Sequence, residues 1–278
     1  MNDSGSGPVA IFDSGVGGLS VLRHVRAMLP DLDLMYVADQ AHVPYGPRPA
    51  SEVRDLVTAV TRFCLQQGAR AIVLACNTAT AAALHDLRAT FPQTPFVGME
   101  PAVKPGAAAT RTGKVGVLAT SGTFESQRYA DLMARFARDV ALYEDPCSGL
   151  VPLIEAGQLD GPQTEDLLRR CMEPMLRAGV DTIVLGCTHY PFVLPTIRAI
   201  AGSQVTIIDP APAVARQVRR VLAQNGLSAD GSGSLRGYTT GNVMALAAMG
   251  QRLLNYELPV SGLQWREGGL YLCEAAAP

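Results

Sequence analysis

The sequence lacks long apolar runs, and none approaches the roughly 18 residues that a membrane-spanning helix needs. It also lacks an excess of either charge, because 23 basic residues nearly balance 25 acidic ones without a long run of either sign. A membrane and a nucleic acid are therefore not expected as partners. Residues 1–7 have neither the basic start nor the apolar centre of a signal peptide, so we expect a cytoplasmic protein.

The six cysteines contain no C-x-x-C pair, and a chain of 278 residues is not a small disulfide-stapled domain. Cys187 and His189 alone cannot complete a tetrahedral zinc site, so no metal is expected. Four cysteines are expected to be ordinary, two as buried inert thiols of amphipathic helices, one in a loop and one in a tail: Cys64, Cys171, Cys147 and Cys273, respectively.

What the sequence does contain is a pair of matched apolar runs that each end in a cysteine. Residues 71–78, AIVLACNT, are followed 111 positions later by residues 182–189, TIVLGCTH. A short β-branched run followed by helix-like sequence predicts a buried parallel strand. Because ligands bind beyond the carboxyl ends of such strands, Cys76 and Cys187 are candidates for one site that acts on its ligand from two sides.

Two further segments repeat in the same order. Residues 8–15 resemble residues 114–121, and residues 97–101 resemble residues 206–210. Matched segments at nearly constant offset predict an internal duplication. Strands that alternate with helices predict an α/β fold with mostly parallel sheets and right-handed crossovers. The expected helices are residues 51–68, 78–91, 164–179, 211–225 and 242–255, with a Gly/Ser-rich turn at 228–237.

The duplication predicts two similar α/β/α domains with the active site in the cleft between them. Residues 100–209 would form the second domain. The remainder, residues 1–99 plus 210–278, would form the first, because the C-terminal part is too small to fold alone. The alternative is one continuous doubly wound sheet with a single site at its edge.

A glycine-rich turn, Asp13-Ser14-Gly15-Val16-Gly17-Gly18, follows the first apolar run. It differs from the dinucleotide fingerprint because Ser20 stands where the third glycine belongs. Its backbone N–H groups still suit a carboxylate or a phosphate. Asn77 and Thr78 begin a helix directly after Cys76, and a helix N-terminus favours a thiolate. The alternative for Cys76 is a buried cysteine behind a helix cap.

Three other polar groups lie near expected strand or helix ends. His189 can modulate the Cys187 thiol or donate a proton near neutral pH. Glu155 precedes Gly157 and faces the negative end of a short helix, which costs a few tenths of a kcal/mol, roughly, unless another contact offsets it. The alternative for Glu155 is a solvated charge. Asp39, with the tight turn at residues 44–46, belongs to the same end of the sheet as Asp13.

From residue 9 to about residue 258 the chain resembles the cofactor-independent aspartate/glutamate racemases, and in particular glutamate racemases. The resemblance implies two α/β domains around the active site, no cofactor and a homodimer. It also implies interconversion of L- and D-glutamate to supply D-glutamate for bacterial peptidoglycan. The motifs that carry it are FDSGVGG from Phe12, AD from Ala38, PYG from Pro44, ACNTA from Ala75, LATSGT from Leu118, EAG from Glu155, GCTHYP from Gly186 and TTG from Thr239.

Inversion of a carbon centre by proton transfer needs a base on one face and an acid on the other. The resemblance implies that Cys76 takes the proton from D-glutamate and Cys187 from L-glutamate. Asp13 would assist Cys76, and His189 with Glu155 would assist Cys187. Substrate-binding candidates are Asp13, Ser14, Pro44, Tyr45, Gly46, Asn77, Thr78, Thr120, Thr123, Thr188 and His189.

Other functions remain open on the sequence. An aspartate racemase would use the same chemistry in a smaller pocket. A hydrolase or transferase would use Cys187 as a nucleophile with His189 and would not need Cys76. A non-catalytic amino-acid-binding protein would share the two-lobed architecture.

Overall fold

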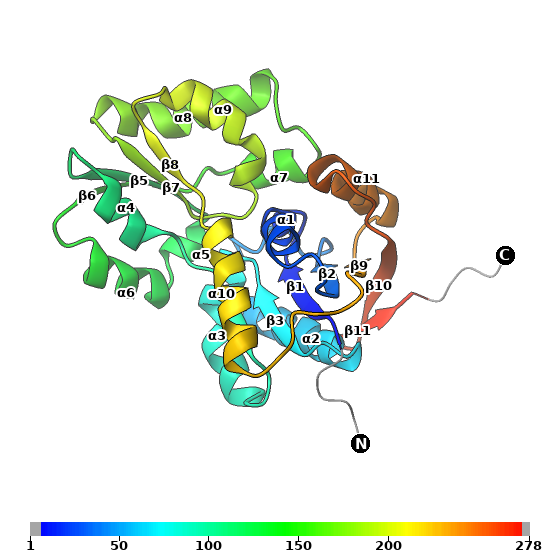
Figure 1. Cartoon of the computed structure of the whole chain (residues 1–278). Helices are drawn as coiled ribbons and strands as arrows, with labels where there is room; N and C mark the ends of the chain where they lie inside the picture. The colour runs from blue at the N-terminus through cyan, green and yellow to red at the C-terminus, as the bar shows by residue number, and fades with distance from the viewer. Residues whose placement is uncertain (1–6, 274–278) are drawn as a thin grey trace.

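The computed structural model describes residues 7–273, which fold around two separate β-sheets (Figure 1). The larger sheet has the order β11-β10-β9-β2-β1-β3-β4, and only its β10–β11 pair is antiparallel. Its strands are β1 (Val9–Asp13), β2 (Leu34–Ala38), β3 (Ala71–Leu74), β4 (Phe96–Gly98), β9 (Leu235–Thr239), β10 (Val260–Arg266) and β11 (Gly269–Leu272).

The smaller sheet is entirely parallel and has the order β6-β5-β7-β8. This order repeats the β2-β1-β3-β4 part of the larger sheet, strand for strand. The predicted α/β duplication is confirmed, and the alternative of one continuous sheet is wrong. The strands are β5 (Lys114–Leu118), β6 (Ala141–Asp145), β7 (Thr182–Leu185) and β8 (Thr206–Ile208).

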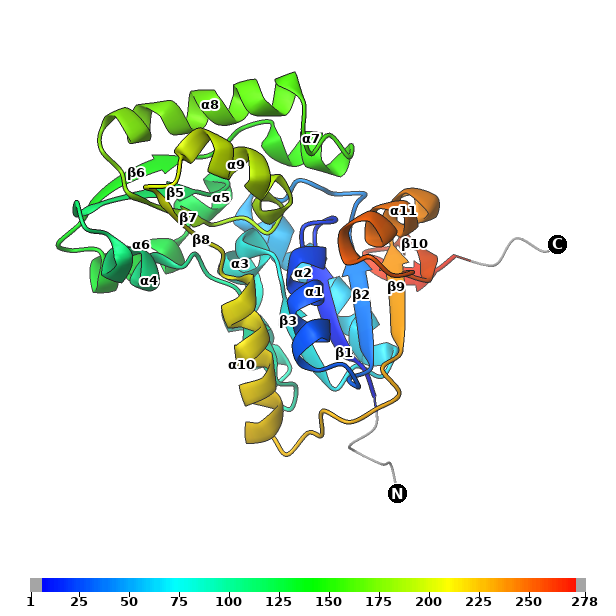
Figure 2. The same ribbon diagram turned by 45° about the horizontal axis from the view of Figure 1, so that its top comes forward.

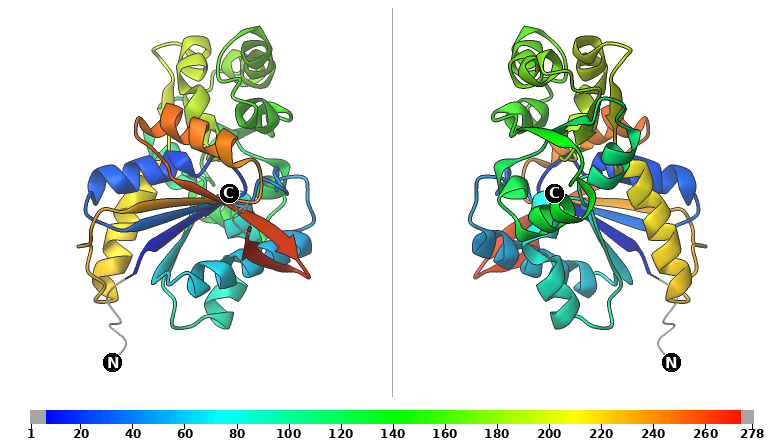
Figure 3. Two further views of the ribbon diagram at one scale, coloured as in Figure 1. Left: turned by 90° about the vertical axis from the view of Figure 1, so that its right-hand side faces the viewer. Right: turned by 90° about the vertical axis from the view of Figure 1, so that its left-hand side faces the viewer.

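Helices cover both faces of the larger sheet (Figure 3). One face carries α1 (Leu19–Met28), α10 (Ala211–Gln224) and α11 (Val243–Leu254), and α10 packs along α1 (Figure 2). The other face carries α2 (Ala50–Gln66) and α3 (Asn77–Thr90). Each predicted helix is found with its ends displaced by at most two residues. No helix within residues 7–273 is long and apolar enough to cross a membrane.

The smaller sheet is covered in the same way. One face packs against α4 (Val103–Ala109), α5 (Ser121–Phe124) and α6 (Gln127–Phe136). The other face packs against α7 (Leu150–Glu155), α8 (Pro162–Arg177), the 3-10 helix η1 (Tyr190–Val193) and α9 (Leu194–Ala201).

Strand residues alternate between two apolar layers, as the pleat of a sheet requires. In β1, Val9 and Ile11 face α1 and α10, whereas Ala10 and Phe12 face α2 and α3. All five residues of β1 are buried, because helices cover both faces of the sheet. The central strands are therefore rigid supports for the polar residues that follow them.

The C-terminal segment differs from the prediction. The expected Gly/Ser-rich turn at 228–237 ends earlier, because β9 begins at Leu235 and pairs in parallel with β2. Cys273 was expected in a tail, but its N–H donates to the carbonyl oxygen of Gly262 (2.9 Å), directly after β11. Strand β9 was not predicted because its partner β2 lies about 200 positions away in the chain. Strand β11 pairs with the nearby β10, but neither carries the continuous apolar pattern of a buried strand.

The carboxylate of Asp33 organises the loop that leads into β9. Its Oδ1 accepts hydrogen bonds from the N–H and Oγ of Ser232 (3.2 and 2.7 Å) and of Ser234 (2.8 and 2.7 Å). The hydrogen bonds from the two serines lower the pKa of Asp33 to about 2.

We expect Asp33→Ala to reduce the free energy of unfolding by about 1 kcal/mol at pH 7. A depressed folded-state pKa stabilises the protein above the unfolded value near 4, so this difference should shrink as pH falls toward about 2. Urea unfolding at pH 7 and pH 3 measures it, with the exposed neighbour Asp31 changed to alanine as the control. An equal loss at both pH values would contradict the role of the Asp33 charge.

Candidate active site

The two cysteines occupy equivalent places at the carboxyl ends of β3 and β7. Cys76 is the N-cap residue of α3, and its Sγ accepts a hydrogen bond from the N–H of Ala79 (3.4 Å). Cys187 follows β7 and precedes η1. Their exposed fractions are only 6% and 7%. The predicted placement of each thiol at a strand end is therefore found.

Both thiols line one cavity of about 20 Å³, which is room for about one water molecule. A ligand much larger than a water molecule can therefore enter only if the residues that line the cavity move apart, as in enzymes that close over their ligands. The cavity is lined by Ser14, Pro44, Tyr45, Gly46, Cys76, Asn77, Thr78, Thr120, Val151, Gly186, Cys187, Thr188 and His189.

The glycine-rich turn after β1 binds directly to the loop after β7. Thr188 donates its hydroxyl to Asp13 Oδ2 (2.8 Å), and Ser20 donates to the carbonyl oxygen of Thr188 (3.0 Å). The N–H of Gly15 donates to Asp13 Oδ1 (2.8 Å), and that of Val16 donates to Glu155 Oε1 (2.7 Å). Two N–H groups of this turn, which were predicted to bind a carboxylate or phosphate ligand, thus donate to carboxylates of the protein itself.

Gly17 allows this close approach. A Cβ atom added there would overlap the His189 imidazole and would lie 2.5 Å from Thr188 Oγ1. The position needs glycine for space rather than for its backbone conformation, because its φ is not in the left-handed region. The glycine-rich turn therefore positions the His189 loop.

His189 links Cys187 to Glu155. Its Nδ1 lies 3.7 Å from Cys187 Sγ, and its Nε2 lies 2.6 Å from Glu155 Oε1. Gln40 donates to the other oxygen, Glu155 Oε2 (2.9 Å). Glu155 is therefore a bound carboxylate and not a solvated charge.

Glu155 and His189 each stabilise the charged form of the other. Burial lowers the pKa of His189, but its contacts with Cys187 and Glu155 outweigh burial and hold the pKa well above its usual value. Burial raises the pKa of Glu155, but the contacts with His189, Gln40 and the N–H of Val16 hold it below its usual value. A charged imidazole beside Cys187 can stabilise a thiolate there.

Asp13 and Cys76 have different surroundings. Burial raises the pKa of Asp13 to about 6, although His189 and the hydrogen bonds from Gly15 and Thr188 oppose the increase. Burial, together with the charge of Asp13, raises the pKa of the Cys76 thiol well above its usual value. The helix N-terminus, which was expected to lower this pKa, is therefore the weaker effect. The hydrogen bonds of Asp13 run to Ser14, Gly15 and Thr188 rather than to Cys76.

Asn77 presents an unsatisfied side-chain amide at the cavity. Its side-chain oxygen and nitrogen are both buried and have no hydrogen-bond partner, and the residue lines the cavity. A buried amide without partners costs about 1–3 kcal/mol, so this amide is available to bind a polar group that enters the cavity.

Thr78, Thr120 and the turn at residues 44–46 also line the cavity, and Thr123 contacts Thr120. Thr120 Oγ1 lies 2.9 Å from Thr78 Oγ1 and 3.1 Å from Thr123 Oγ1. The N–H of Gly122 donates to the carbonyl oxygen of Gly46 (3.0 Å), which joins the turn to α5. Thr78 and Thr120 line the cavity, whereas Thr123 lies behind them and does not.

Asp39 holds the turn at residues 44–46 in place through a hydrogen bond from Tyr45. Its buried carboxylate accepts hydrogen bonds from Tyr45 Oη, Thr240 Oγ1 and Trp265 Nε1, each at 2.8 Å. His42 Nδ1 lies 3.0 Å from Asp39 Oδ2. Strand β10 thereby supports Tyr45, which the sequence analysis did not anticipate.

The sequence analysis also missed Gln40 and Thr239 as contributors to the site. Thr239 donates to Gln40 Oε1 (2.8 Å), and Gln40 in turn binds Glu155. Gln40 follows Asp39 after β2, so its place near the carboxyl end of a strand was an available signal. Thr239 was recognised only as the start of the TTG motif, and its place at the end of a strand could not be foreseen because β9 was not predicted.

Comparison with known proteins agrees with this architecture. The family model described as Asp/Glu/Hydantoin racemase matches residues 19–218. The glutamate racemase of Pseudomonas aeruginosa is 57% identical over 226 residues, which cover 81% of this chain and 85% of the relative. The glutamate racemase of Ectopseudomonas mendocina is 51% identical over 261 residues, which cover 94% of this chain and 99% of that relative.

Solved structures of two further glutamate racemases have the same fold. That of a Bacillus anthracis isoform is 31% identical, with a TM-score of 0.84 over 94% of this chain and 98% of its own. The Escherichia coli glutamate racemase was solved in complex with L-glutamate and the activator UDP-MurNAc-ala. It is 30% identical, with a TM-score of 0.84 over 97% of this chain and 100% of its own. By sequence and by fold, this chain belongs to the Asp/Glu/hydantoin racemase family.

Proposed function

We propose that this protein is a glutamate racemase that interconverts L- and D-glutamate by proton transfer between two cysteines. The observation that carries the proposal is that Cys76 and Cys187, at equivalent ends of duplicated strands, line the same cavity. Relatives that are 51–57% identical over most of the chain are glutamate racemases, which favours glutamate over aspartate as substrate.

In the proposed mechanism each thiolate removes the α-proton from one face and the other thiol returns a proton to the opposite face. Cys187 acts as the base toward L-glutamate, and Cys76 acts as the base toward D-glutamate. His189, held by Glu155, stabilises the Cys187 thiolate. The ammonium group of the substrate would bring positive charge to Cys76 and oppose the effects that raise its pKa.

In the proposed mechanism, groups of the protein rather than a cofactor stabilise the α-carbanion. Asn77, with two unsatisfied polar atoms, is proposed to bind a substrate carboxylate. The other proposed binding groups are Asp13, Ser14, Pro44, Tyr45, Gly46, Thr78, Thr120, Thr188 and His189, with Thr123 supporting Thr120. Closure of the cavity over the substrate would exclude water and strengthen each of these contacts.

The proposal extends to organisation and role. We propose that residues 1–99 plus 210–278 and residues 100–209 are the two domains, which is supported by the division of the strands between two sheets. A homodimer, a cytoplasmic location and a role in peptidoglycan synthesis, and so in cell-wall biogenesis and cell shape, rest on the resemblance to glutamate racemases.

The deciding experiment follows D-glutamate by circular dichroism in deuterated buffer, with purified protein and no added cofactor. We expect loss of optical activity and one deuterium at the α-carbon of the product, because the returning proton comes from a solvent-exchanged thiol. Aspartate under the same conditions should remain optically active. No change with either amino acid would refute racemisation and leave Cys187 as a candidate nucleophile.

The pH dependence of kcat/KM should reflect Asp13. Because the pKa of Asp13 is raised to about 6, its carboxylate is protonated below that pH and its charge is lost. We expect kcat/KM to fall about tenfold per pH unit below pH 6. The two enantiomers have equal free energies, so the fall must be the same in both directions.

Asp13→Asn should have lower activity and lack this acidic limb. The carboxyl groups of free glutamate titrate near pH 4 or below, roughly, so they do not account for a limb at pH 6. Initial rates with both enantiomers between pH 5 and pH 8 measure the effect. An acidic limb near pH 6 that persists in Asp13→Asn would assign it to another group.

A further inference from the structure

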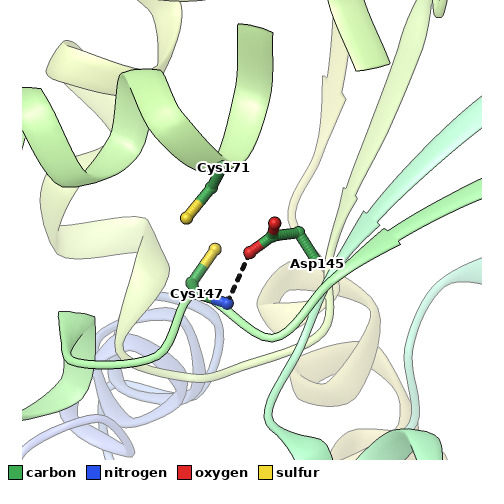
Figure 4. A group of neighbouring side chains, drawn as sticks. All are labelled: Asp145, Cys147 and Cys171. Carbon is green, nitrogen blue, oxygen red and sulfur yellow. Dashed lines mark hydrogen bonds between the residues drawn. The ribbon is translucent and has the colours of Figure 1, made fainter. Parts of the chain in front are cut away.

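A second group of thiols lies outside the catalytic cavity. Cys147, in the connection between β6 and α7, faces Cys171 of α8, and Asp145 ends β6 beside them (Figure 4). The two sulfur atoms and a carboxylate oxygen of Asp145 all lie within 4.8 Å of one another. The two cysteines lie far apart in the sequence, which does not show that this loop and α8 meet.

We propose that Asp145, Cys147 and Cys171 form a binding site for a soft divalent cation of the zinc class. Two thiolates and one carboxylate are ligands that such cations accept, and three protein ligands leave a fourth position for water. Ligand atoms around a tetrahedral ion with metal–sulfur bonds of about 2.3 Å are about 3.7 Å apart. The group therefore has to contract by only about 1 Å.

The surroundings hold the ligands in this arrangement. The N–H of Cys147 donates to Asp145 Oδ1 (2.8 Å), which fixes the carboxylate beside the two thiols. Tyr190 completes the wall, since its hydroxyl is close to Cys147 and lies 3.4 Å from the carbonyl oxygen of Pro146. Binding replaces the thiol protons with the cation and releases them to solvent.

A cation can reach the group from one side. Cys171 and Cys147 are at most 9% exposed, but Cys147 also lines a cavity of about 180 Å³. This cavity adjoins the catalytic one, because Pro44, Gly46, Thr120 and Val151 line both. Cys147 precedes α7, the helix that ends at Glu155, so a bound cation would tie this helix to α8.

A disulfide is the alternative for this pair, although both cysteines are free in the structure. A bound cation would supply positive charge beside three groups that are potential anions.

The test uses the full chain with both catalytic cysteines replaced, Cys76→Ser/Cys187→Ser, so that they cannot bind the probe. Under reducing conditions, titration with Cd²⁺ should produce a thiolate-to-cadmium absorption band that saturates at one Cd²⁺ per chain. Zn²⁺ should compete with it and should raise the Tm of the protein.

In the same background, Cys171→Ser or Cys171→Ala should weaken Cd²⁺ binding by at least about tenfold, and Asp145→Asn by about tenfold. Cys64→Ser, which removes another buried thiol, should leave it unchanged. Far-ultraviolet circular dichroism confirms that each variant is folded. No band, a band that persists in both Cys171 variants, or loss of two free thiols to a disulfide without Cd²⁺ would overturn the proposal.

Discussion

Cys76→Ser and Cys187→Ser should each reduce racemisation by about 10³-fold while leaving the fold intact. The two thiols face one cavity from duplicated strands, and each is proposed to serve as base in one direction and as acid in the other. A serine hydroxyl is a far weaker acid than a thiol, so it cannot supply the base, and a proton-transfer group of this kind contributes about 10²- to 10⁴-fold.

The two variants should differ in hydrogen exchange. In Cys187→Ser, where Cys76 remains, D-glutamate should acquire α-deuterium from solvent without inversion. In Cys76→Ser, where Cys187 remains, L-glutamate should do so. Mass analysis of each recovered enantiomer measures this difference. Cys64→Ser is the matched control, because Cys64 is a buried thiol of α2 away from the cavity. Near-normal turnover in either catalytic variant would refute the two-base mechanism.

Gly17→Ala should reduce kcat/KM by about 10²-fold, because its new Cβ atom would overlap the His189 ring and crowd Thr188. To relieve the overlap, the loop after β7 must move by a fraction of an ångström or more, and a displacement near 1 Å can cost about 10²-fold in rate. The contacts of His189 with Cys187 and Glu155 depend on that loop. Initial rates with both enantiomers measure the loss.

Gly262→Ala is a suitable control for Gly17→Ala. Gly262 lies in β10, and a Cβ atom there would have its nearest neighbours at 3.2 Å or beyond, led by the Cys273 side chain. We expect this variant to keep nearly full activity. If Gly17→Ala kept comparable activity while remaining folded, the close approach of the glycine-rich turn would not position His189.

Sequence patterns predicted the parts of the fold that are locally encoded. The apolar runs at β1, β3, β5 and β7 are buried strands, apart from the half-buried Lys114 at the start of β5. Such strands are recognisable because helices cover both of their faces. Their repetition predicted the two similar sheets. Strands β9, β10 and β11, which form one side of the larger sheet, were not predicted, because strands with mixed polarity depend on their sheet neighbours.

By itself, the sequence determined the α/β duplication and the places of Cys76 and Cys187 at matching strand ends, since both follow from local pattern and order along the chain. Only the tertiary structure decided which groups meet across the two sheets. Asp13 binds Thr188, and Gln40 binds Glu155, in contacts that span more than 100 positions. Such hydrogen bonds leave no periodic trace in sequence, because they depend on distance and direction between side chains that folding brings together.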